Sequence, residues 1–88
     1  MIRITPLATG PSSTRLKLEG QLVGESVALL GTELERFSAL GHAVSLDLSN
    51  VWFASLEAME LLREALSRGT LLVAASPLLA SQLPSGAP

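Results

Sequence analysis

Residues 44–59 constrain the fold of this chain more than any other segment, because their hydrophobic pattern changes period in the middle. Residues 43–48 form an apolar run of strand-forming residues, short enough to be a central strand covered on both faces. A short polar turn is expected at residues 49–50. Ser55 then opens a helix as its N-cap, with Glu57 in the first turn, where the helix dipole favours a carboxylate. A buried strand that leads directly into a helix is typical of α/β proteins.

Two short strands are expected before the first helix. Residues 2–5 alternate between apolar and polar side chains until Pro6 interrupts the pattern, and residues 15–20 alternate in the same way. Residues 8–13 are rich in glycine, proline and serine, which indicates a turn between the two strands. Gly20 is expected to end the second strand.

Two longer segments carry apolar side chains three or four residues apart and are predicted to be amphipathic helices. The first covers residues 25–40, includes Gly31 at a cost of about 1 kcal/mol relative to alanine, and ends at Gly41. The second runs from Ser55 to Gly69. Glycine is favoured just past a helix end because it adopts a left-handed conformation at no steric cost. The expected buried positions are Val27, Leu30, Leu34 and Phe37 in the first helix, and Ala58, Met59, Leu62, Ala65 and Leu66 in the second.

The last part of the chain completes an alternation of strands and helices. Residues 70–75 form another continuous apolar strand, and the serine and proline at residues 76–77 start a short helix over residues 78–83. Residues 84–88 are expected to be a disordered tail. The sequence therefore predicts a single α/β domain over residues 1–83 in the order β-β-α-β-α-β-α. Its mixed sheet has about four strands, a parallel core and a cover of amphipathic helices.

Composition narrows the classes of function. The chain has 88 residues, 48% of them hydrophobic, a net charge of -2 and no cysteine. Lysine and arginine are scattered from Arg3 to Arg68, so no basic stripe offers a surface to nucleic acid. Without cysteine, and with His42 as the only histidine, neither a metal site nor a cofactor is expected. The apolar run at residues 71–80 is too short to cross a bilayer, so we expect a soluble cytoplasmic domain without membrane insertion.

Residues 46–58 read L-D-L-S-N-V-W-F-A-S-L-E-A. This segment, with the order of elements around it, resembles the central motif of STAS domains, the family of bacterial anti-sigma-factor antagonists and of the cytoplasmic tails of sulfate transporters. In that family the segment runs roughly as L-D-L-S-x-V-x-F-x-D-S-S-G-L, and a serine at the helix start accepts phosphate. Here the strand and the V-x-F step are present, whereas the D-S-S-G position reads Ser55, Leu56, Glu57 and Ala58.

The resemblance implies a STAS-like domain that lacks the phosphoserine switch. In the alignment without gaps, Leu56 takes the place of the phosphoacceptor and has no hydroxyl group. A slip of one residue would make Ser55 the acceptor, but it would put Ala54 in place of the aspartate and break the V-x-F spacing. Ser55 is therefore interpreted as an N-cap. Glu57 either imitates a permanently modified state or simply starts the helix, and the second role is favoured.

A docking surface for a protein partner is expected around this helix start. Trp52 is the only tryptophan, and if Val51 and Phe53 face the core, Trp52 points the other way. Tryptophan is enriched among binding hot spots, although packing of this side chain under a neighbouring loop is an equally open alternative. Asp47 is expected to bind backbone amides of the following turn rather than to do chemistry. The predicted partner-binding residues are Trp52, Ser55, Glu57 and Glu60.

The expected function is a non-catalytic protein–protein interaction module that resembles anti-sigma-factor antagonists and acts in the regulation of transcription. The resemblance implies an anti-sigma factor with a serine-kinase-type fold as the partner. The alternative is a soluble STAS-type subunit of an ABC-type transport complex, whose partner is a transporter subunit. A small enzyme is a remote alternative, because no nucleophile–base pair is visible. The sequence leaves a homodimer and nucleotide binding open.

Overall fold

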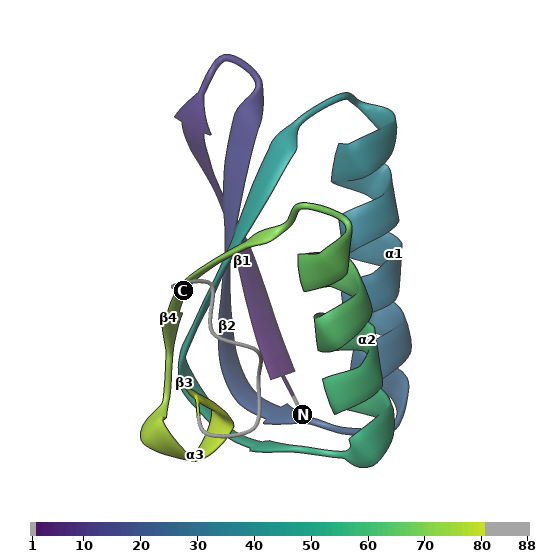
Figure 1. Cartoon of the computed structure of the whole chain (residues 1–88), viewed down its shortest axis with the longest axis vertical. Helices are drawn as coiled ribbons and strands as arrows, with labels where there is room; N and C mark the ends of the chain where they lie inside the picture. The colour runs from purple at the N-terminus through teal and green to yellow at the C-terminus, as the bar shows by residue number, and fades with distance from the viewer. Residues whose placement is uncertain (1, 81–88) are drawn as a thin grey trace.

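The computed structural model describes residues 2–80 as a mixed four-stranded sheet with two long helices packed on one of its faces (Figure 1). The strands lie side by side in chain order and are β1 (Ile2–Gly10), β2 (Ser13–Leu22), β3 (Ala43–Ala54) and β4 (Leu71–Ala75). The helices are α1 (Glu25–Ala39), α2 (Leu56–Ser67) and the single turn α3 (Pro77–Ala80). The structure thus has two long helices, and the expected third is described only as far as Ala80. The rest of that helix and the expected tail over residues 84–88 lie outside the described residues.

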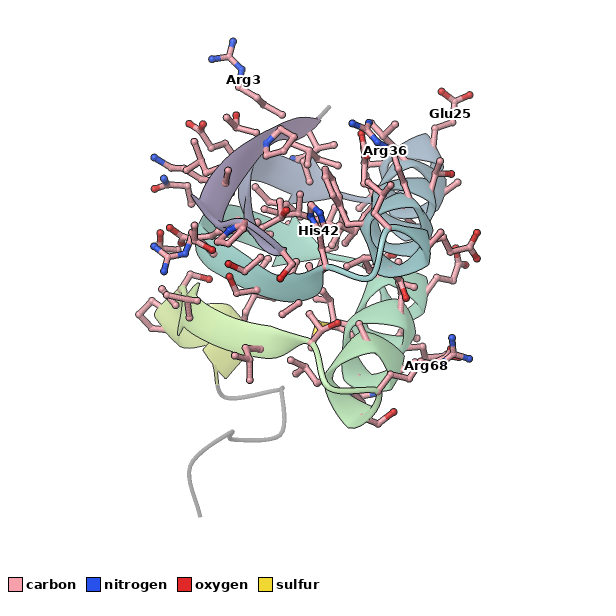
Figure 2. The ribbon with its side chains drawn as sticks, turned by 90° about the horizontal axis from the view of Figure 1, so that it is seen from above. Arg3, Glu25, Arg36, His42 and Arg68 are labelled. Carbon is pink, nitrogen blue, oxygen red and sulfur yellow. The ribbon has the colours of Figure 1, made fainter. Side chains whose placement is uncertain are left out.

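The sheet combines a hairpin with a parallel core. β1 and β2 are antiparallel, whereas β2, β3 and β4 run parallel to one another. Parallel neighbours need a crossover connection, and α1 and α2 supply the two crossovers. Both crossovers step in the same direction across the sheet, so right-handed connections place both helices on the same face, as Figures 1 and 2 show. The predicted mixed sheet of four strands with a parallel core is confirmed.

The core lies between the two long helices and the sheet face that they cover. Successive strand residues point to opposite faces, so every second side chain is buried over residues 14–18 of β2 and 44–48 of β3, among them Leu16, Leu18, Leu46 and Leu48. Full burial of one such leucine is worth about 1.5–3 kcal/mol. The predicted helix faces are confirmed, since the helices bury Leu30, Phe37, Ala58, Met59, Leu62 and Ala65 and pack Val27, Leu34 and Leu66 against the same core.

The prediction that residues 43–48 are covered on both faces is wrong. The side chains of Ser45 and Asp47 alternate with the buried leucines of β3 and point to the face that neither α1 nor α2 covers. Polar side chains at these positions let a parallel strand keep one face in water, although such strands usually have helices on both sides.

The two N-terminal strands are longer than predicted. β1 continues through Pro6, which pairs with Leu16, and the expected turn over residues 8–13 is correspondingly short. Proline is tolerated there because β1 is an edge strand with no partner for its outer amides among the described residues. β2 passes through Gly20, which has a positive φ of 115°, and ends at Leu22. Glycine adopts this backbone conformation easily, so Gly20 bends the strand instead of ending it.

The polar turn expected at residues 49–50 is also absent, because β3 runs through this segment as a bulge. Lys17 pairs with Asp47 and Glu19 pairs with Asn50, so β3 has one more residue than β2 between the two pairs. A bulge of this kind re-aims the side chains that follow it. The next buried position therefore falls at Val51, three residues after Leu48 rather than two.

A second bulge follows immediately, at Trp52. Gly20 pairs with Val51 and Gln21 pairs with Phe53, which leaves Trp52 as the extra residue of β3. The expectation that Phe53 faces the core beside Val51 is wrong, since the Phe53 side chain is 49% exposed and Val51 is fully buried. The extra residue interrupts the alternation of side chains and turns both aromatic rings toward solvent.

Candidate functional site

The junction between β3 and α2 is held by hydrogen bonds around Ser55. The Ser55 N–H donates to the Leu22 carbonyl at 3.1 Å, and its Oγ accepts from the Ala58 N–H at 3.2 Å. Its backbone is extended (φ -71°, ψ 169°) and its carbonyl accepts the N–H of Met59 at 2.9 Å. These are the features of an N-cap residue, so that prediction is confirmed. The hydroxyl group is therefore engaged in the helix start.

Ser76, the residue between β4 and α3, forms two hydrogen bonds with the bulged end of β3. The Ser76 Oγ donates to the Val51 carbonyl at 2.8 Å, and the Ser76 N–H donates to the Leu48 carbonyl at 3.3 Å. Both carbonyls flank the first bulge, where the ladder with β2 is interrupted. The pairing of β3 with β4 ends at Leu48 and Ala75, so Ser76 supplies donors to two carbonyls of β3 at and beyond that end.

Asp47 has the structural role that the sequence predicted. Its Oδ1 accepts the N–H of Ser49 at 3.1 Å and the Oγ–H of Ser49 at 2.7 Å. The hydrogen bond from the Ser49 hydroxyl, then that from its N–H, lowers the pKa of the Asp47 carboxyl, and the charges of Lys17 and Arg15 act in the same direction. These contacts brace the first bulge of β3.

Three large apolar side chains lie exposed at the junction that these contacts hold. Leu56 is 80% exposed, Trp52 is 63% exposed and Phe53 is 49% exposed. We call these three residues the hinge patch. They fall within five consecutive positions, on an extended segment and the first residue of a capped helix. The structure therefore places Trp52 in solvent and not beneath a loop.

The remaining predicted site residues lie on α2 beside the hinge patch. Glu57 and Glu60 are both exposed, in the first two turns of the helix. Glu60 lies four residues after Leu56 and three after Glu57, so it shares a side of the helix with each of them, whereas the consecutive residues Leu56 and Glu57 point in different directions. Of the four predicted partner-binding residues, Ser55 is thus half-buried in the helix start and the other three face solvent.

Sequence reasoning missed a half-open groove of about 620 Å³ between the C-terminal halves of α1 and α2. His42 lies on its lining and is partly buried. A hydrogen bond of 2.9 Å joins its Nδ1 to the Oγ1 of Thr14, and its ring stacks on Phe37 at 6.0 Å between centroids. The alternation of Leu16 and Leu18, extended back by two residues, would have placed Thr14 on this side of β2.

Within residues 2–80, no three His, Asp or Glu side chains gather as a metal site. The helices of that same stretch are all too short or too polar to cross a bilayer. No family model matches the chain, and no curated protein matches it. The fold and the hinge patch are accordingly the basis for assigning a function.

Proposed function

We propose that this chain is a non-catalytic protein–protein interaction domain of the STAS type, which docks onto a protein partner through the hinge patch. The observation that carries the proposal is the exposure of Trp52, Phe53 and Leu56 within five consecutive positions, at a junction held by the hydrogen bonds of Ser55 and Ser76. Exposed apolar clusters rimmed by polar groups mark interaction sites. Large side chains such as tryptophan supply most of the binding energy at such sites.

The proposed docking does not depend on phosphorylation. Leu56 stands where the STAS resemblance places the phosphoacceptor serine, and its side chain is the most exposed of the three in the hinge patch. The neighbouring hydroxyl of Ser55 accepts a hydrogen bond from the Ala58 N–H and caps α2. A leucine in place of a serine turns a switchable position into a permanent apolar contact. The domain would then bind its partner constitutively.

The partner that the resemblance favours is a cytoplasmic anti-sigma factor with a serine-kinase-type fold. A photo-crosslinking amino acid at position 56, introduced in native cells, tests both the surface and the partner. The matched control is position 40. Leu40 is 62% exposed, but it follows the C-terminal end of α1 and so lies at the opposite ends of the strands from Leu56. Mass spectrometry of a product specific to position 56 should identify the anti-sigma factor.

The other outcomes of this experiment are equally informative. Capture of a transporter ATPase or permease at position 56 would replace the proposed partner with that of a transport complex. Equal products from positions 56 and 40 would contradict docking through the hinge patch. With the purified partner, Trp52→Ala should weaken binding by about tenfold or more, the effect of losing an interface hot spot, while Leu40→Ala leaves it unchanged. Incubation with the partner kinase and ATP should leave Ser55 without phosphate.

A further inference from the structure

Three of the eight acidic residues lie on the helix starts at the end of the molecule that carries the hinge patch. β2 and β3 are parallel, and each leads from its carboxyl end into a long helix. The first turns of α1 and α2 therefore lie at the same end of the strands. Three exposed carboxylates stand there: Glu25 on α1, seen projecting outward in Figure 2, and Glu57 and Glu60 on α2. The Leu22 carbonyl, which accepts the Ser55 N–H, ties the two helix starts together. We call this part of the surface the acidic rim.

Neither ion pair of the described chain includes a carboxylate of the acidic rim, and the exposed Arg63, three residues after Glu60 on α2, is the cation of that helix next to it. The ion pairs within residues 2–80 join Glu33 to Arg36 at 3.2 Å and Glu64 to Arg68 at 2.7 Å, toward the other ends of the helices. On the sheet, Arg3 stands directly opposite Glu19 in the ladder of β1 and β2.

The two helix starts therefore carry an excess of negative charge, three carboxylates with Arg63 one turn farther along α2. The three rim carboxylates carry a charge of -3. Because the net charge of the whole chain is -2, all other side chains together carry +1. The two helix N-termini contribute about half a positive charge each, which leaves this end negative. Carboxylates at the same end of the molecule as an exposed apolar patch complement a basic surface with an apolar contact and steer association with it.

We infer that the surface which receives the hinge patch is basic: an apolar contact site surrounded by arginine or lysine. This inference rests on the proposed function and names the chemistry of its partner. Rim charges act mainly on the association rate and are screened by salt. The partner should therefore bind fast at low ionic strength, and the apolar patch should supply most of the lifetime of the complex.

Three synthetic amphipathic helical peptides with the same apolar face and lysine, glutamine or glutamate on the polar face test the inference. Fluorescence of Trp52, the only tryptophan, reports binding. We expect the lysine peptide to bind about tenfold or more tightly than the glutamine peptide at low salt, and the glutamate peptide to bind least. The preference should shrink at 0.5 M salt, where the Debye length is about 4 Å.

Charge reversal provides the matched comparison. Glu60→Lys should abolish the preference for the lysine peptide, whereas Glu35→Lys, an equal change at an exposed position farther along α1, should preserve it. Equal affinities of the lysine and glutamine peptides for the parent would overturn the inference and leave docking through the hinge patch intact. An equal loss in both variants would also overturn it, since only net charge would then matter. If no peptide binds and Trp52 emission stays constant, the docking proposal fails as well.

Discussion

The hydroxyl of Ser76 donates a hydrogen bond to the carbonyl of Val51 across 2.8 Å, from the residue before α3 to the bulged end of β3. The two residues are 25 positions apart in the chain. Their contact joins the last described turn of the fold to the strand that presents the hinge patch. The stability of this surface therefore depends on a segment remote from it in sequence.

Ser76→Ala should destabilise the domain by about 1–3 kcal/mol, because a partly buried carbonyl loses its donor. Chemical denaturation of the parent and the variant measures this difference. Ser67→Ala is the control, since the Ser67 hydroxyl also donates to a backbone carbonyl, that of Glu64, but on an exposed helix end. Equal losses in the two variants would show that the Ser76 contact has no special role.

Leu62→Ala should lower the free energy of unfolding by about 2–5 kcal/mol, the usual range for a leucine truncated in a core. The reason is that Leu62 is fully buried on the inner face of α2. Leu56→Ala removes the same atoms from the same helix at a site that is 80% exposed. That variant should change the unfolding free energy by only about 0.5 kcal/mol. Thermal melts of both proteins test the prediction. Similar midpoints would show that Leu62 does not lie on the buried face of α2.

Gly31→Ala should stabilise the domain by about 0.4–1 kcal/mol. Gly31 lies inside α1, and an added methyl group would meet the Leu61 side chain at an ordinary contact distance of 3.9 Å. Gly41→Ala is the opposite case, because Gly41 has a φ of +76° that alanine rarely adopts. Denaturation midpoints should move in opposite directions, and a loss of stability in Gly31→Ala would mean that the two helices pack more tightly than this contact indicates.

Asp47 should contribute to the dependence of stability on pH. Its pKa is lower in the folded protein than the value of about 3.9 expected in the unfolded chain. The stabilisation is therefore fully present above the unfolded pKa and is lost as the pH falls from about 5 through the folded pKa. In Asp47→Asn the side-chain amide oxygen can still accept hydrogen bonds from Ser49, but the amide group does not titrate.

Denaturation of parent and Asp47→Asn between pH 2 and pH 7 isolates this effect, because the other carboxyl groups are common to both proteins. The parent should be the more stable protein at neutral pH, and the two should converge in acid. A difference that stays constant over the whole range would show that the charge of Asp47 does not stabilise the fold.

Trp52 should emit as an exposed indole, with a red-shifted maximum that iodide or acrylamide quenches readily, because its side chain is 63% exposed. Trp52→Ala should shift the unfolding free energy by about 0.5 kcal/mol or less, as is usual for surface sites. Blue-shifted emission that resists quenching would contradict this prediction, because it would show that the ring is shielded from water, for example by a second molecule.

Features that depend on near neighbours in the chain could be predicted from the sequence. The buried faces of α1 and α2 follow from spacings of three and four residues, and Leu30 and Leu62 lie where the period puts them. The cap at Ser55 forms with an amide only three positions away. The helix ends at Gly41 and Gly69 need only the left-handed conformation that glycine adopts.

Strand pairing decided the rest, because its partners are distant in the chain. Pro6 is compatible with a strand only because β1 is at the edge of the sheet, and that position depends on the strand order. Residues 49–50 look like a turn by composition. Pairing with β2 and the hydrogen bonds from Ser76 instead keep them within β3. The sequence by itself thus determined the two long helices, the cap at Ser55 and the α/β class, since hydrophobic period and capping act over a few residues. Only the tertiary structure decided the bulges that expose Trp52 and Phe53, since a bulge is defined by its register with another strand.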